Sequence, residues 1–180
     1  MAALQTPEDI ISLLQDMERR SKQQAAGLGQ QETATESWTA IGFRIGQQYF
    51  VIPLGESREV FPLPEQVTAV PKSQSWVYGI VNLRGELLPV FDLGLYLDGS
   101  AAKPSKRSRI IVINDAELSS GVLVDEVFGL KHFQRHPEPL TQASAAAPYL
   151  TGEISQQNIT WQVFSFKHLT ADSRFLNAAA

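Results

Sequence analysis

The residues of this sequence that could bind a metal ion lie close together in its second half. His132 and His136 are separated by three residues, and Asp125 and Glu126 precede them. On a helix, two histidines at this spacing lie one turn apart and can bind the same metal ion. Pro137 ends any helix at once, and the residues between the acids and the histidines favour a strand or a loop. A metal site here is therefore an alternative that depends on the local backbone, and we expect none.

Motifs for nucleophilic or nucleotide chemistry are also missing. The sequence has no cysteine, which excludes disulfides, thiolate metal sites and cysteine nucleophiles. It contains no Gly-x-Ser-x-Gly elbow and no Gly-x-x-x-x-Gly-Lys phosphate loop. Asp92, Asp125 and Glu126 are candidates for a catalytic pair, but no motif fixes their separation. We expect no enzymatic activity and no cofactor.

Composition narrows the class of protein further. The chain has 180 residues, 43% of them hydrophobic and 19% charged, which is typical of a globular protein. Its net charge of −4 argues against a nucleic-acid-binding protein. No apolar run reaches the roughly 20 residues that span a bilayer, and the N-terminus lacks the pattern of a signal peptide. We expect a cytoplasmic protein that does not insert into a membrane.

The elements that must position any site are mostly short strands. The runs Ile80–Leu83 and Leu87–Phe91 flank Arg84–Glu86, which predicts a β-hairpin. Gly85 supplies the positive φ that such a turn needs. Pro89 cannot donate a hydrogen bond, so the second strand is expected to be an edge strand or to be bulged there.

Other parts of the chain show similar β-prone runs between Gly and Pro breaks. Residues 1–37 are different: we expect a helix at 6–25 and then a polar linker, and this helix either packs on the main domain or docks to a partner. Further strands are predicted at 41–45, 49–52, 57–61, 109–113, 121–128, 130–134, 154 and 160–166, with short helices at 93–97 and about 167–177.

The second half of the chain repeats features of the first. Gly79 and Phe91 recur as Gly152 and Phe164, an offset of 73 residues in both cases (152 − 79 and 164 − 91). A constant offset between separated positions indicates two copies of one structural unit. About five short strands per copy suit a small β-barrel, which removes exposed edges.

A second match sets the expected boundaries of the two units. Residues 58–61 (Arg-Glu-Val-Phe) correspond to residues 125–128 (Asp-Glu-Val-Phe) at an offset of 67 (125 − 58). We therefore expect an all-β domain over 38–180, with a first barrel at about 40–97 and a second at about 109–166. Two such barrels packed side by side leave a groove between them.

The same residues resemble a known family, the CheW-like coupling proteins of bacterial chemosensory systems. The resemblance covers residues 40 to about 170, and its most specific part is Asn-Leu-Arg-Gly followed by Leu-Pro-Val-x-Asp-Leu at 82–93. The leader with its helix, the opening Ile-Gly-Phe-Arg at 41–44 and the stretch at 125–129 look most like the version that serves type IV pilus twitching motility. Flagellar chemotaxis is the alternative.

This resemblance implies a fold and a function together. The fold is two intertwined SH3-like five-stranded barrels, in agreement with the repeat. The function is a non-catalytic adaptor between the cytoplasmic tip of a methyl-accepting chemoreceptor and the regulatory domain of a CheA-type histidine kinase. Such an adaptor must offer two binding surfaces at once, so that the state of the receptor biases the kinase equilibrium.

Residue by residue, the resemblance also implies two contact surfaces. A kinase-binding surface is expected on an exposed strand of the first barrel, where Ser57 replaces the usual Val and removes an apolar contact. A receptor-binding groove is expected to include residues of the 80–91 hairpin and strand residues near 124–127. The kinase-binding residues are Arg58, Glu59 and Val60, and the receptor-binding residues are Asn82, Arg84, Val124 and Val127.

Two alternatives stay open at this point. Arg84 either forms an internal ion pair, for which Glu59 is the expected partner, or reaches an acidic group of a receptor, and the two roles are compatible. The chain is also compatible with a generic SH3-like module that binds an extended peptide in an aromatic groove. The aromatic candidates for such a groove are Trp38, Tyr49, Trp76 and Tyr78.

Overall fold

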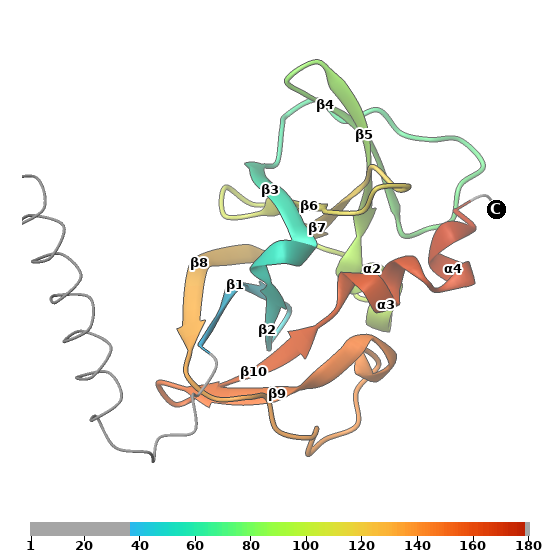
Figure 1. The fold of residues 1–180 in the computed structure, drawn as a ribbon. Helices are drawn as coiled ribbons and strands as arrows, with labels where there is room; N and C mark the ends of the chain where they lie inside the picture. Colours follow the sequence, from blue (N-terminus) through green and yellow to red (C-terminus); the bar gives the residue numbers. More distant parts are fainter. Residues whose placement is uncertain (1–36, 179–180) are drawn as a thin grey trace, which may run out of the picture. The chain divides into compact units, whose positions relative to one another are not determined.

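The structure is a computed structural model that describes residues 37–178, which belong to one compact unit. The predicted N-terminal helix and most of the linker lie outside the described residues. No helix in the described part is long and apolar enough to cross a membrane. The elements in chain order (Figure 1) are β1 (Trp38–Ile45), β2 (Gln48–Pro53), η1 (Leu54–Glu56), β3 (Ser57–Pro62), β4 (Val77–Leu83), β5 (Glu86–Asp92), α2 (Leu93–Asp98), β6 (Arg109–Ile113), β7 (Gly121–Val124), β8 (Glu126–Phe133), η2 (Ala147–Tyr149), β9 (Leu150–Gln156), β10 (Ile159–Phe164), α3 (Phe166–Thr170) and α4 (Ser173–Leu176).

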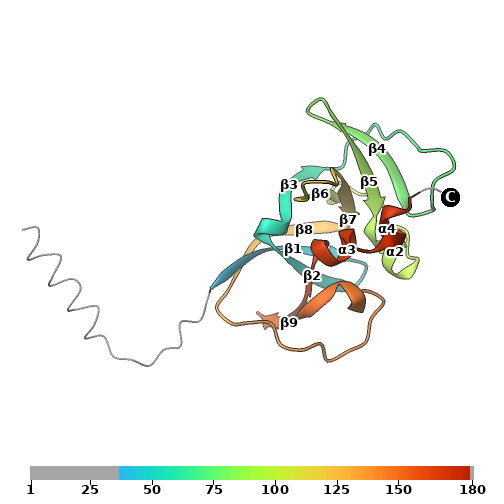
Figure 2. The same cartoon turned by 45° about the vertical axis from the view of Figure 1, so that its right-hand side comes forward.

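The hairpin predicted around Gly85 is confirmed and projects from the domain in both views (Figures 1 and 2). Arg84 (φ 53°) and Gly85 (φ 90°) both adopt positive φ, as in a type I′ turn, whose twist matches that of the flanking strands. The side-chain oxygen of Asn82 accepts a hydrogen bond from the Gly85 amide at 2.8 Å. Arg84 is thus held in a left-handed conformation by the turn that contains it.

The expectation that Pro89 marks an edge strand or a bulge is wrong. β5 lies between β4 and β7, and Pro89 faces Ile80 in regular register. Ile80 directs both of its backbone hydrogen bonds away from β5, to Thr68. Pro89 and Ile80 therefore form a non-hydrogen-bonded pair. The backbone nitrogen of Pro89, which carries no hydrogen, faces β7, and β5 pairs with β7 only from Val90 onward. A proline fits a central strand here because no ladder bond is lost.

The strands form two five-stranded sheets, sheet A in the order β8-β1-β2-β10-β9 and sheet B in the order β3-β6-β7-β5-β4. An all-β fold of two SH3-like units is therefore confirmed, although neither sheet closes into a full barrel. The units do not follow the expected boundaries at 40–97 and 109–166, because each sheet takes strands from both halves. The halves exchange β1–β2 for β6–β7, so the two units are intertwined (Figure 1).

This exchange occurs at two points where a strand ends and the chain passes into the other sheet. After β2, Pro53 ends the strand, and the single turn of η1 redirects the chain into the other sheet. The strand predicted at 121–128 is interrupted at Asp125, because β7 belongs to sheet B and β8 to sheet A. The backbone N–H of Asp125 binds the carbonyl of Arg44, and its carboxylate accepts a bond from the Gly46 amide at 2.7 Å. These hydrogen bonds fix Asp125 at the point where the chain passes from sheet B to sheet A.

The internal repeat is confirmed, with one change in alignment. In β4–β5 and in β9–β10 a register shift occurs at equivalent places, with Gly79 opposite Val90 and Gly152 opposite Val163. The other match differs from the expected offset of 67. β3 is bulged at Arg58, and β8 is bulged at the residue between Val127 and Gly129, so the structural offset is 70 (128 − 58).

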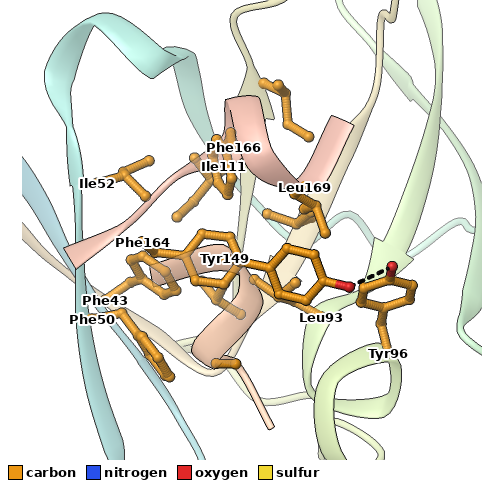
Figure 3. Close-up of a cluster of buried hydrophobic side chains, with 14 of the residues drawn as sticks. Phe43, Phe50, Ile52, Leu93, Tyr96, Ile111, Tyr149, Phe164, Phe166 and Leu169 are labelled. Carbon is orange, nitrogen blue, oxygen red and sulfur yellow. Dashed lines mark hydrogen bonds between the residues drawn. The ribbon is translucent and has the colours of Figure 1, made fainter. Parts of the chain in front are cut away.

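The main core lies between the two sheets and is rich in aromatic side chains (Figure 3). Phe43 and Phe50 of sheet A stack at 5.4 Å between ring centroids, and Phe164 meets both rings edge-on. The single C-terminal helix predicted at about 167–177 is instead two short helices, α3 and α4. They are separate because Asp172 caps α4, accepting a hydrogen bond from the Arg174 amide.

A partly buried hydrogen-bond triad fixes these helices to the core. The hydroxyl of Tyr149 donates to the Asp172 carboxylate, and the hydroxyl of Tyr96 contacts both groups, at 2.9 Å from Tyr149 and 3.1 Å from Asp172. Figure 3 shows the contact between the two hydroxyls. Burial and the bond to Asp172 raise the pKa of Tyr149, while the Tyr149 hydroxyl lowers the pKa of Asp172. The triad is therefore most stable with Tyr149 neutral and Asp172 ionised.

Replacing Tyr149 by Phe should destabilise the domain by about 1–2 kcal/mol, because the ring stays in place while the Asp172 carboxylate loses one of its hydrogen-bond donors. Urea unfolding of the variant and the wild type at pH 7 measures this. Since the pKa of Asp172 is lowered in the folded state, its contribution is present above the unfolded pKa and is lost as pH falls through the folded pKa. The difference between the two proteins should shrink in acid; an unchanged difference would contradict this assignment.

Candidate interaction surface

The strand that carries the predicted kinase-binding residues is an edge strand. β3 pairs only with β6, so one edge has no neighbouring strand in the described domain. Arg58 is exposed, and Glu59 and Val60 are half-buried, so all three reach the surface. The hydroxyl oxygen of Ser57 is buried without a hydrogen-bond partner. An edge strand with charged side chains is available to a partner yet protected from non-specific strand pairing.

The predicted ion pair between Arg84 and Glu59 is confirmed. Their charged groups lie 2.7 Å apart, and the guanidinium of Arg84 also covers the ring of Phe61 at 5.1 Å from its centroid. The side chain of Arg84 nevertheless stays 76% exposed. The pair therefore orients Arg84 and leaves it accessible, and such an exposed pair adds only about 0–1 kcal/mol to stability.

A second ion pair lies beside the first and was not predicted. Arg58 donates to the carboxylate of Glu86 at 2.9 Å, and the hydroxyl of Ser119 donates to the other carboxylate oxygen at 2.8 Å. These bonds, first that from Ser119 and then that from Arg58, lower the pKa of Glu86. Its place close to Arg84 in the predicted turn was a signal for Glu86, but no pattern in the sequence indicated which strand faces the turn.

Together the four side chains form an alternating arrangement of charge, here called the charge quartet (Arg58, Glu59, Arg84 and Glu86). Two come from β3 and two from the turn of the β4–β5 hairpin. They surround a small hollow whose apolar walls are Phe61, Leu83 and Leu88. The quartet brings residues predicted for the kinase surface and a residue predicted for the receptor surface onto one face.

The opposite side of the hairpin presents a different surface. Asn82 lies across from Leu87 in the register of β4 and β5. Both are exposed, and Leu87 at 68% is the most exposed large hydrophobic residue in the described part of the chain. Because neighbouring residues of a strand point to opposite faces, the exposed Leu87 side chain lies on the face away from Leu88, which lines the hollow of the charge quartet.

Comparison with known proteins identifies the family. The family model of the CheW-like domain matches residues 39–174. The chain belongs to the CheW-like family. A curated relative, protein PilI of Pseudomonas aeruginosa, is 38% identical over 182 residues and covers 99% of both chains. The chemotaxis protein CheW of Helicobacter pylori is 30% identical over 146 residues, covering 81% of this chain and 87% of that protein.

A solved structure supports the fold of this CheW-like protein. The scaffolding protein TtCheW from Thermoanaerobacter tengcongensis superposes with a TM-score of 0.62. It is 21% identical in sequence, and the match covers 71% of this chain and 88% of that one. The intertwined pair of five-stranded sheets is thus an arrangement shared with a CheW protein.

One predicted receptor-binding residue of the CheW-like chain does not reach the surface as expected. Val124 ends β7 and is only 1% exposed, because all four residues of this central strand are covered on both faces. Val127 is partly buried and packs against the main core. The hollow that Arg84 lines includes none of Asn82, Val124 and Val127. The side chain of Val124 is a core residue, and assigning it a direct contact was wrong.

The residues considered for metal or acid–base chemistry are engaged locally. His132 lies on β8 and its ring is hydrogen-bonded to the Thr39 hydroxyl at 2.9 Å. Within residues 37–178, no three potential ligands gather into a metal site. Asp92 caps α2 and accepts hydrogen bonds from the amides of Leu95 and Ala102, while burial raises its pKa. Its carboxylate holds the loop after α2 in place.

The four aromatic residues proposed for a peptide groove do not form one. Trp76 belongs to the main core, Trp38 and Tyr49 pack against a second cluster inside sheet A, and Tyr78 packs against a third inside sheet B. Three separate clusters cannot line a single peptide-binding surface. The structure therefore favours the interpretation that these rings fill the small cores of the CheW-like fold.

Proposed function

We propose that this CheW-like protein is a non-catalytic adaptor that couples methyl-accepting chemoreceptors to a CheA-type histidine kinase. In this proposal it acts in the cytoplasm, at arrays of membrane receptors, in the pathway that controls type IV pilus twitching motility. The similarity to PilI over almost the full length of both chains supports the pilus system. Flagellar chemotaxis is the second candidate, supported by the CheW relative of Helicobacter pylori.

The observation that carries the proposal is the ion pair between Glu59 and Arg84. Glu59 is assigned to the kinase regulatory domain, together with Val60 and Arg58, and Arg84 to the receptor tip, together with Asn82. An adaptor changes kinase activity only if its two partners are energetically coupled. A direct contact between a residue of each surface provides such coupling. A receptor acid that approaches Arg84 competes with Glu59 and so weakens the ion pair between Arg84 and Glu59.

Binding measurements test this proposal directly. Calorimetry with the regulatory domain of the chemosensory kinase from the same organism should show saturable binding, and so should calorimetry with a helical-hairpin fragment of a receptor tip. Deleting the gene should abolish twitching and leave swimming intact. Loss of swimming alone would favour the flagellar alternative, and a protein that binds neither partner would contradict the adaptor function.

A further inference from the structure

The two outer strands of sheet B are joined by side chains rather than by backbone. β3 and β4 stand at opposite ends of the strand order, and no ladder joins them in the described domain. Both ion pairs of the charge quartet cross this opening, Glu59 to Arg84 and Arg58 to Glu86. In addition to the β3–β6 ladder, these two contacts join β3 directly to the turn of the hairpin.

The bulge in β3 makes the double contact possible. In a regular strand, Arg58 and Glu59 would point to opposite faces, and only one of them could reach the hairpin. Here Ser57 pairs with Ile113 and Glu59 with Val112, so Arg58 is the extra residue. A bulge re-aims the side chain that it carries. Arg58 has only Glu86 as an ion-pair or side-chain hydrogen-bond partner among residues 37–178.

Glu86 is the point at which three elements meet. It begins β5, one carboxylate oxygen binds Arg58 of β3, and the other binds Ser119 in the loop before β7. Each oxygen thus has its own partner, which fixes the orientation of the carboxylate. A half-exposed carboxylate with two fixed partners contributes little to global stability, so its effect on the surface is local.

We propose that Glu86 is a positioning residue for the kinase-facing surface: through Arg58 it holds the β3 bulge in the conformation that presents Glu59 and Val60. The inference rests on the proposed function, because it assigns the surface to the kinase regulatory domain. Glu86 belongs to neither of the predicted contact sets. The role of Arg58 thereby changes: it supports the kinase-facing strand through Glu86 instead of contacting the kinase itself, and Glu59 and Val60 remain the contact residues.

Replacing Glu86 by Gln keeps the shape of the side chain and removes its charge. We expect the variant to bind the kinase regulatory domain about threefold to tenfold more weakly, with an unchanged thermal midpoint. Glu117→Gln is the matched control: it lies near Ser119, is exposed, and its side chain has no hydrogen bond or ion pair within the described part. The control should bind like the wild type; equal losses in both variants would overturn the proposal.

Exchanging the two charges separates positioning from direct contact. The double variant Arg58→Glu/Glu86→Arg restores an ion pair across the same opening, so it should recover most of the affinity that Glu86→Gln loses. If Arg58 instead touches the kinase directly, the double variant will bind at least as weakly as the single one, which would overturn the positioning role.

Hydrogen exchange gives a readout that needs no kinase. In Glu86→Gln, amides of β3 between Glu59 and Phe61 should exchange about threefold to tenfold faster, while those of β8, the equivalent strand of sheet A, should not change. This holds even if the wild type fails to bind the kinase, which would refute the proposed function alone. Unchanged exchange in β3 would refute the positioning role whether or not the kinase binds.

Discussion

Glu59→Arg is expected to weaken binding to the kinase regulatory domain by roughly 30-fold, or about 2 kcal/mol. The substitution removes the acid assigned to the kinase and places a second positive charge beside the Arg84 guanidinium, which lies 2.7 Å from the Glu59 carboxylate in the wild type. Like charges at this distance repel, so the side chain should turn away from the hairpin. Calorimetric titration at low and high salt measures the loss, and screening should reduce it at high salt.

Two further variants identify the origin of this loss. Glu65→Arg reverses the charge of an exposed residue just beyond β3 that has no ion pair in the described part of the chain, and it should leave affinity within about twofold. The double variant Glu59→Arg/Arg84→Glu rebuilds the internal pair with reversed charges. If Glu59 contacts the kinase, the double variant stays weak; if full affinity returns, the internal pair rather than contact with Glu59 controls binding.

The largest effect on stability is expected at Gly152. A side chain there would place its Cβ 2.6 Å from the Glu138 carbonyl oxygen and 2.9 Å from Pro137. The backbone cannot give way easily, because Glu138 and Glu153 exchange two hydrogen bonds of 2.7 and 2.8 Å. The close contacts add to the backbone strain that a side chain would have at φ 157°. We therefore expect Gly152→Ala to lower the free energy of unfolding by about 3 kcal/mol or more, as measured by urea unfolding.

Gly46 supplies the matched control for this prediction. It also has a positive φ, 56°, but a Cβ there would meet nothing within 4 Å. Gly46→Ala should therefore cost only the backbone term, about 1–2 kcal/mol. If both variants lose the same stability, the close approach of the chain near Glu138 is not what requires glycine at position 152.

Local features of the fold could be predicted because short stretches of sequence determine them. The turn at Arg84–Gly85 and the helix capped by Asp92 rest on residues within a few positions of one another. The exchange of strands between the two halves could not be derived from spacing, since a repeat of 73 residues describes two separate barrels equally well. The resemblance to a family supplied that arrangement, and the interruption at Asp125 is what the strand prediction missed.

At the candidate surface, too, contacts that depend on long-range strand arrangement could not be predicted from the sequence. The pairing of Arg84 with Glu59 was predicted because two charged residues near one rim need partners. The partnership of Arg58 with Glu86 depends on a bulge that moves one residue out of register, and no hydrophobic pattern reports such a shift. Val124 was carried over from the family resemblance, and the sequence could not show that it is buried, because a central strand covered on both faces has no alternation of apolar and polar residues.

The adaptor function requires that both partners bind at the same time, and one measurement tests this most directly. The wild-type protein, mixed with the kinase regulatory domain and a receptor-tip fragment, should form a ternary complex in analytical ultracentrifugation. The affinity for the kinase domain should differ with and without saturating receptor fragment, because Glu59 and Arg84 link the two surfaces. Mutually exclusive binding, or simultaneous binding with no change in affinity, would contradict coupling through the charge quartet.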